Sequence, residues 1–304
     1  MIQILLQILP LAVAAATPLL LAVIGELTVE RSGLINLGLE GMMLMAAMTA
    51  VLAAQWSHSV LIGIGGGIAG AFGMAIVFGI PAIIFRTDQI VTGTAVNFLA
   101  LGVTGVVYRQ LQNSGVFEQA VPHLGEGGLP WLRAIPLAGP ALFGQDLLIP
   151  VAWIAVPVVA RVVLWNTSFG LRLRACGENP VAVTASGFSV QRHRWAALAI
   201  EASLAGIAGA YLSLSLANGF AENMVSGRGF IALAIVIFGR WRIRGSLAGA
   251  SLFGAAAATQ FALQALGRGV PFHLLLALPY IITIAILCGV TGAVRSPEAL
   301  GKRD

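Results

Sequence analysis

Two polar side chains, Asn36 and Glu40, lie inside an apolar stretch, where they could bind a solute or transfer a proton. They lie four residues apart in the apolar run 34–54, and a helix there would place them on one face. An amide beside a carboxyl could contact a polar solute, and the carboxyl alone could carry a proton. The pair could equally serve structure, as a hydrogen bond between helices or as a cap for a broken neighbouring helix. Because charged groups cost free energy inside hydrocarbon, both residues are functional candidates.

Other amide and hydroxyl groups lie in later apolar runs. Asn97 and Thr94 form one polar spot, while Gln260 and Gln264 lie four apart on another predicted helix. These groups carry little net charge, so they would suit a neutral solute that bears hydroxyl or amide groups.

Aromatic side chains near these spots could stack on a base or a sugar face. Phe98, Phe220 and Phe230 are the candidates, although a phenylalanine in a membrane helix more often packs or faces lipid. The predicted solute path is bordered by Asn36, Glu40, Asn97, Phe98, Phe230 and Gln260.

Glu201 interrupts the apolar run 195–217 close to a basic segment. Its position predicts an ion pair with Arg194 or Arg192, so a structural role is favoured over a role in transport.

Motifs for enzymatic chemistry are missing from the sequence. The Gly-x-x-x-x-Gly-Lys-Ser/Thr loop that binds phosphate does not occur, and the chain's one lysine is Lys302. The four histidines are dispersed without metal-ligand spacing. The chain is therefore not expected to be an enzyme, to bind a cofactor or to hold a metal ion.

Composition predicts a polytopic membrane protein, since 58% of the 304 residues are hydrophobic and 10% are charged. The net charge of +5 does not indicate nucleic-acid binding, because the basic residues lie between apolar runs and form no patch with interleaved aromatics. Cys176 and Cys288 are interpreted as structural thiols.

The apolar runs predict an all-α fold with about eight to ten transmembrane helices in one domain, residues 1–304. A polar turn is expected at residues 25–31, and the run 229–239 is too short to cross alone, which predicts a half-span. The predicted runs are 1–24, 34–54, 60–85, 90–108, 147–165, 195–217, 229–239, 247–266 and 272–288.

Basic residues indicate the topology. The segments 161–194, 240–244 and 295–303 hold five, three and three of the 17 lysines and arginines, so all three are expected in the cytoplasm. Counting crossings backwards places the N-terminus outside. The turn-rich segment 109–146 mixes both charge signs and is predicted to be an external loop.

The loop 166–194 should contain a short helix over residues 180–186. Asn179 can cap it, Pro180 suits its first position and Gly187 can end it in a left-handed conformation. Such a short helix needs a supporting surface, which could be the lipid headgroups or a soluble partner.

The loop sequence GENPVAVTASGF resembles the coupling helix of the ATP-binding-cassette (ABC) permeases that import branched-chain amino acids, ribose-type sugars and nucleosides. Val183 and Phe188 depart from the family pattern. The resemblance extends to residues 25–47, 87–102 and 226–249, whose sequences are most similar to those of the nucleoside (simple sugar) permeases. The implied coupling residues are Gly177, Glu178, Asn179, Pro180, Ala182, Ala185 and Gly187.

A short internal match suggests an inverted repeat like that of type II importers. Gly33-Leu-Ile-Asn-Leu-Gly-Leu39 resembles Gly229-Phe-Ile-Ala-Leu-Ala-Ile235, and each copy is expected to open an apolar helix, the two pointing in opposite directions. The alternative is that any two membrane helices beginning with glycine and aliphatic residues look alike.

The resemblance implies a multi-pass permease of the bacterial plasma (inner) membrane, surrounded by membrane lipid. Its partners would be ATP-binding cassette subunits that hold the ATP and Mg²⁺, an extracytoplasmic substrate-binding protein, and a second permease subunit, often an unlike chain that makes a heterodimer. The solute would be a nucleoside or a related sugar. An ion- or proton-coupled secondary transporter that uses Glu40 is the alternative, and a channel-like or structural subunit is a third hypothesis.

Overall fold

The computed structural model describes residues 2–113, 122–124, 132, 135, 138–265, 281 and 296–302, and this part of the chain is helical, without strands. The elements of the first half are α1 (Ile2–Arg31), α2 (Leu39–Ser57), α3 (Val60–Gly79), the π-helical turn η1 (Ile80–Ile84), α4 (Gln89–Asn113) and α5 (Ala138–Phe143). Those that follow are α6 (Leu148–Pro150), the π turn η3 (Val151–Ala155), α7 (Val156–Asn166), α8 (Ser168–Glu178), α9 (Pro180–Ala185), α10 (Val190–Tyr211), the π turn η4 (Leu212–Leu216), α11 (Arg228–Phe238) and α12 (Ile243–Ala265).

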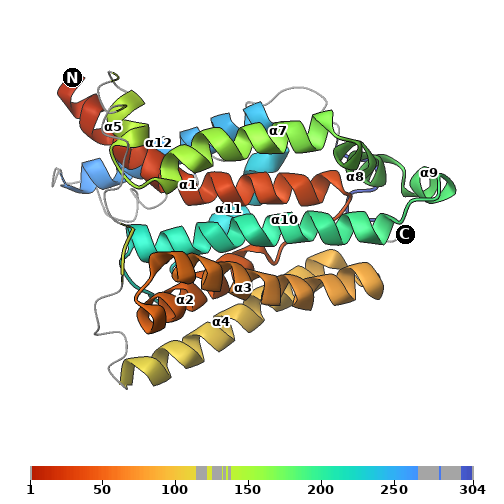
Figure 1. Ribbon diagram of the computed structural model, residues 1–304, viewed down its shortest axis with the longest axis horizontal. Helices are drawn as coiled ribbons and strands as arrows, with labels where there is room; N and C mark the ends of the chain where they lie inside the picture. The colour runs from red at the N-terminus through yellow and green to blue at the C-terminus, as the bar shows by residue number, and fades with distance from the viewer. Residues whose placement is uncertain are drawn as a thin grey trace.

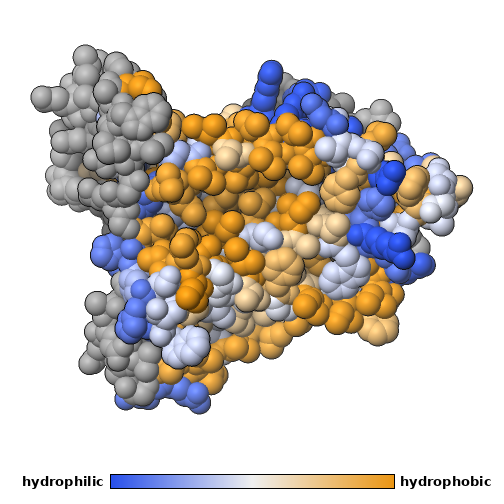
Figure 2. Space-filling view, in the orientation of Figure 1, coloured by the Kyte–Doolittle hydropathy of each residue, from blue (hydrophilic) through white to orange (hydrophobic). Residues whose placement is uncertain are grey.

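Six helices of the described chain are long and apolar enough to cross a membrane: Ile8–Arg31, Leu39–Ser57, Val60–Ile84, Gln89–Asn113, Leu148–Asn166 and Val190–Leu216. The predicted half-span is confirmed as the shorter apolar helix Arg228–Phe238. The predicted run 272–288 lies outside the described residues except for position 281, and the segment 109–146 is described only in part. The apolar surface forms a band over the middle of the molecule in Figure 2.

The two ends of the molecule are set by contacts between distant segments. At one end, which we call the α9 end, Arg31 donates hydrogen bonds to the carbonyl of Trp241, and Ala299 N donates to the carbonyl of Gly177 at 2.8 Å. At the other, the α5 end, the Gln145 amide donates to the carbonyl of Pro10 at 3.0 Å. The three predicted basic segments therefore share the α9 end (Figure 1).

The helices form two sets of opposite direction. In the first, α1 and α3 run toward the α9 end and α2 runs away from it; in the second, α10 and α12 run away and α11 runs toward it (Figure 1). The packing is reciprocal, because α1 contacts α11 and α12 while α10 contacts α2 and α3. This is the arrangement of an inverted repeat. The predicted register of the repeat is wrong, because Gly33 lies in a turn before α2 whereas Gly229 lies within α11.

Glycines let the central helices approach closely, as the glycine-rich run 60–85 predicts. A Cβ at Gly66 would lie 2.5 Å from Ala53 Cβ on α2, and one at Gly206 would lie 2.5 Å from Ile68 Cα on α3. Backbones at such distances leave no room for a larger residue, so these helices pack through small side chains.

Two predicted boundaries are wrong at the start of the chain. Residues 25–31 are not a polar turn but the last turns of α1, and residues 34–38 precede α2 instead of belonging to it. The acids did not end the helix because they have partners inside the protein: Glu26 accepts from the backbone of Asn36, and Glu30 accepts from the indole of Trp241.

Candidate functional site

The short helix in the polar loop forms as its sequence predicts. The side chain of Asn179 accepts a hydrogen bond from Ala182 N at 3.0 Å, Pro180 occupies the first helical position, and α9 ends at Ala185. Gly187 follows with φ +80°, and Gly187 N donates to the carbonyl of Thr184 at 2.9 Å. Each signal is local, which explains why α9 could be placed within one residue.

Neighbouring segments hold α9 at the edge of the molecule. A Cβ at Gly177, at the end of α8, would lie 2.4 Å from the carbonyl oxygen of Arg31, so this glycine permits close packing of α8 against α1. Within α9, Val183 is buried whereas Val181 is 76% exposed, and α9 projects beyond the other helices in Figure 1. The exposed face, including Ala182 and Ala185, is thus available to another surface.

Glu40 caps the broken helix α11 from the first turn of α2. Its two carboxylate oxygens accept hydrogen bonds from Gly227 N at 2.7 Å and from Gly229 N at 2.6 Å. Backbone N–H groups at a helix start have no partner within their own helix, and a carboxylate there also interacts favourably with the helix dipole. The structure thus favours the capping role that the sequence left open for Glu40.

Asn36 does not share a helix face with Glu40, because it lies in the turn before α2. Its amide donates to Glu201 Oε2 at 2.7 Å, and its side-chain oxygen accepts from Gly38 N at 2.9 Å. The partner observed for Glu201 is therefore Asn36, in place of the predicted arginines. Arg194 donates instead to the carbonyl of Ser32.

Asn97 joins α4 to the same place. Its side-chain oxygen accepts from Gly41 N at 2.8 Å, and its amide donates to the carbonyl of Leu37 at 2.7 Å. The structure therefore brings Asn36, Glu40 and Asn97 together around the start of α2, where all three are buried and bonded to protein groups. Phe98 and Phe230 are not buried with them, since 74% and 47% of their surface is exposed.

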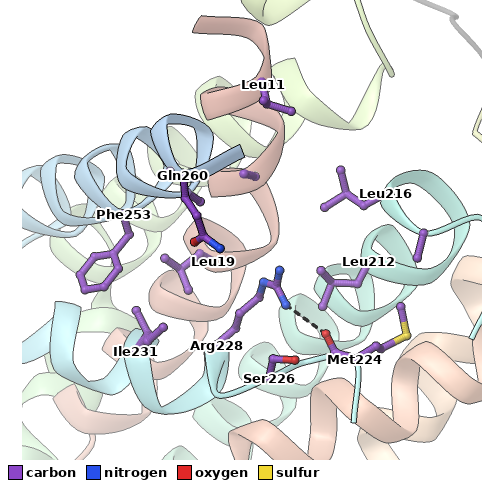
Figure 3. A pocket seen from close by; sticks show the side chains of 14 residues that line it. Leu11, Leu19, Leu212, Leu216, Met224, Ser226, Arg228, Ile231, Phe253 and Gln260 are labelled. Atoms are coloured by element: carbon purple, nitrogen blue, oxygen red, sulfur yellow. Dashed lines mark hydrogen bonds between the residues drawn. The ribbon is translucent and has the colours of Figure 1, made fainter. Parts of the chain in front are cut away.

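A cavity of about 690 Å³ lies on the α11 side of this framework, between α1, η4, α11 and α12. Its walls are mostly apolar, and the polar side chains that line it are Ser226, Arg228 and Gln260. Figure 3 shows the guanidinium of Arg228 and the amide of Gln260 pointing into the same space. Gln260 is the predicted path residue that lines this cavity; the side chain of Gln264 lies outside the described residues.

Arg228 is the cavity residue that the sequence interpretation missed. Its Nη1 donates to the carbonyls of Met224 and Val225 at 3.0 and 2.9 Å, which fixes the side chain over the turn before α11. The Glu40 carboxylate accepts from the backbone of the same turn, at Gly227 and Gly229, so both charged side chains lie at the start of α11. The signal that could have found it is an arginine directly before a half-span, because a helix too short to cross begins or ends below the membrane surface.

Metal chemistry finds no support in the described part of the chain, where no three His, Cys, Asp or Glu side chains lie together as ligands would. The arrangement instead offers a polar spot in an apolar cavity, next to a helix start fixed by hydrogen bonds. Such a site can bind and orient a neutral solute that has both apolar faces and polar edges.

The chain is similar in sequence to several known proteins. A model of the family described as "Branched-chain amino acid transport system / permease component" matches residues 8–288. The guanosine ABC transporter permease protein NupQ of Bacillus subtilis is 34% identical over 313 residues, covering 99% of this chain and 97% of the relative. The nucleoside ABC transporter permease protein NupC of Lactococcus lactis is 34% identical over 311 residues, covering 94% and 92%. No solved structure matches the chain.

Proposed function

Because the chain belongs to the family of branched-chain amino acid transport system permease components, we propose that it carries a nucleoside or a related sugar-type solute through the membrane. It is a permease subunit of an ABC transporter, and the six long apolar helices in its described part make it a multi-pass protein of the bacterial inner membrane. As a transport component it is not itself an enzyme.

The cavity at the start of α11 carries the proposal for the solute. A guanidinium, an amide and a hydroxyl group stand among apolar walls, as a nucleoside with flat apolar faces and polar edges requires. Arg228 is the charged side chain that lines the cavity, and its Nη1 already donates to the carbonyls of Met224 and Val225, so a neutral nucleoside would be held by hydrogen bonds and not by an ion pair. The names of the two relatives, a guanosine and a nucleoside permease, agree with this choice.

The other path residues take different proposed roles. Gln260 contacts the solute, while Asn36, Glu40 and Asn97 border the path by holding the starts of α2 and α11 in place. A place on the solute path for Phe98 and Phe230 requires a second permease subunit that covers their exposed rings.

We propose that α9 is the contact with the ATPase. The α9 end then faces the cytoplasm, segment 166–194 is the coupling loop, and segment 109–146 is external, within a single permease domain. Support comes from an exposed short helix that is capped at Asn179 and held at Gly177. ATP and Mg²⁺ bind to the partner ATPase, an extracytoplasmic binding protein delivers solute at the α5 end, and a second, unlike permease chain completes the path.

The test is uptake of labelled guanosine into cells that carry the chain with its partner subunits. Unlabelled adenosine, cytidine and ribose serve as competitors, and the assay is repeated after ATP depletion at a maintained proton gradient. We expect uptake to require ATP and nucleosides to compete better than ribose. Uptake that follows the gradient after ATP depletion would instead indicate a secondary transporter that uses Glu40.

Two variants and one control separate the proposed roles. Ala182→Glu on the exposed face of α9 should abolish coupled uptake while the protein still reaches the membrane, and Ser168→Glu, exposed at the start of α8, should not. Arg228→Gln should raise the KM for guanosine about tenfold, because a charge-assisted hydrogen bond is lost. An unchanged KM would remove Arg228 from the solute site.

A further inference from the structure

An apolar groove of about 430 Å³ runs along the outside of the helices, separate from the solute cavity. Figure 1 shows α1 between α7 and α10, and Figure 2 shows an apolar surface over these helices. The groove is lined by Ile24, Thr28, Val151, Ala155, Val156, Val159, Ala160, Val163, Leu164, Ile200, Ser203 and Leu204. Its apolar lining suits a hydrocarbon chain.

A cluster of arginines around one tryptophan lies where the walls of the groove reach the α9 end. The guanidinium carbons of Arg31, Arg161 and Arg174 lie 5.9, 5.4 and 5.7 Å from the centre of the Trp165 ring. Trp165 directly follows the groove residue Leu164. On α1, Arg31 lies three residues after the groove residue Thr28, which places both on one helix face. The cluster and the groove therefore form one continuous surface.

The cluster has an excess of positive charge. Arg31 is held by the carbonyl of Trp241, whereas Arg161 is exposed and the buried Nε of Arg174 has no hydrogen-bond partner. The acids near Arg31 are Glu178 and Glu30, and Arg174 and Arg242 also lie near it. Glu30 already accepts from the indole of Trp241. The three guanidinium groups therefore have more N–H donors than the neighbouring carboxylates can accept hydrogen bonds from.

We propose that this surface binds an anionic phospholipid, with an acyl chain in the groove and the headgroup phosphate on Arg161 and Arg174. Charge complementarity selects the headgroup, because basic residues between membrane helices attract anionic lipids at the membrane surface. The groove favours a lipid over a free phosphate ion, because a phosphate ion would contact only the arginines whereas a lipid would also place an acyl chain in the groove. Trp165 provides a flat apolar wall between the two parts, at the level where tryptophan is enriched in membrane proteins.

The experiment measures retained lipid by native mass spectrometry of the purified full-length chain in detergent, titrated with phosphatidylglycerol or with phosphatidylcholine. We expect tighter binding of phosphatidylglycerol, weakened about fivefold for each arginine removed in Arg161→Gln and Arg174→Gln. Arg172→Gln is the charge control, because its guanidinium lies over Phe188, 4.0 Å from the ring centre, away from Trp165.

A matched pair on α7 tests the groove itself. Val159 lines it and is 58% exposed, while its neighbour Val158 is 57% exposed and does not line it. Val159→Trp should reduce phosphatidylglycerol binding at least fivefold and Val158→Trp should leave it unchanged, with both variants monodisperse on size exclusion.

Three outcomes would overturn the proposal. Equal binding of the two lipids would show that the arginines do not select the headgroup, and competition by millimolar inorganic phosphate that persists in Val159→Trp would indicate a simple anion site. Loss of bound phosphatidylglycerol when the second permease subunit is present would assign the surface to that subunit. Guanosine uptake is measured separately, so failure here leaves the transport proposal standing.

Discussion

The two segments that lead into α2 and α11 differ in burial although they occupy corresponding places in the inverted repeat. Residues 32–38, before α2, are mostly buried, and Asn36 within them bonds to Glu201. Half of residues 218–227, before α11, are exposed, and Ser226 within them lines the solute cavity. One segment is therefore part of the core and the other is open to a solute.

Under the proposed function, this difference assigns solute recognition to the second half of the repeat. The first half supplies Glu40, whose carboxylate fixes the start of α11, and the second half supplies the cavity groups that a solute can reach. An inverted repeat provides two similar backbone arrangements. The side chains then make the segment before α2 rigid and the segment before α11 accessible. We expect substitutions around the start of α2 to change stability more than solute recognition, and those around residues 218–228 to do the reverse.

The largest effect is expected at Gly229, where the halves touch. A Cβ there would lie 2.5 Å from the backbone nitrogen of Glu40, so Gly229→Ala forces the two helix starts apart. Overpacking of this kind costs about 3 kcal/mol, more than the roughly 1 kcal/mol that alanine gains over glycine in a helix. The midpoint of thermal unfolding in detergent should fall by several degrees.

Gly219→Ala is the control for that change, because a Cβ at Gly219 in the exposed segment meets no atom within 4 Å. Its unfolding midpoint should equal that of the unchanged protein. Equal midpoints for the two variants would show that the halves do not meet tightly at Gly229.

An intermediate effect is expected for Glu40→Gln. The amide keeps one acceptor oxygen but presents an N–H₂ group to the other backbone donor, which costs about 1–2 kcal/mol. The unfolding midpoint should fall, while ATP-dependent uptake persists. Glu222→Gln removes an exposed ion pair with Arg109 and should change stability by less than about 0.5 kcal/mol. Complete loss of uptake in a stably folded Glu40→Gln protein would contradict the capping role.

The sequence could predict elements whose signals are local. The cap at Asn179, the proline after it and the glycine at 187 all lie within nine residues, so α9 was predicted correctly, and the half-span 229–239 followed from its length alone. The sequence could not predict contacts between residues that lie far apart in the chain. Nothing near Asn36 shows that its partner is Glu201, 165 residues away, so an apolar pattern that continues through a buried turn was interpreted as helix.

The same limit explains the missed cavity residue. A polar stretch such as 218–228 predicts a turn correctly, but the depth of that turn depends on where α11 begins, and Glu40 of another helix determines that. The sequence interpretation therefore did not place Arg228 at the cavity that it lines in the fold.

The smallest effects on stability are expected at two positions with positive φ, one in each of the segments before α2 and α11. One of them carries asparagine and the other glycine, and each can be replaced by the other residue type. Asn218 (φ +50°) is exposed, whereas Gly33 (φ +90°) is buried, and a Cβ at Gly33 would lie 3.3 Å from Gly177 Cα. Glycine and asparagine both tolerate this conformation, so Asn218→Gly should change the free energy of unfolding by less than about 0.5 kcal/mol. Gly33→Asn has to displace the end of α8 as well and should cost about 1 kcal/mol. Thermal unfolding of both variants measures the difference, and equal costs would mean that the two segments are packed alike.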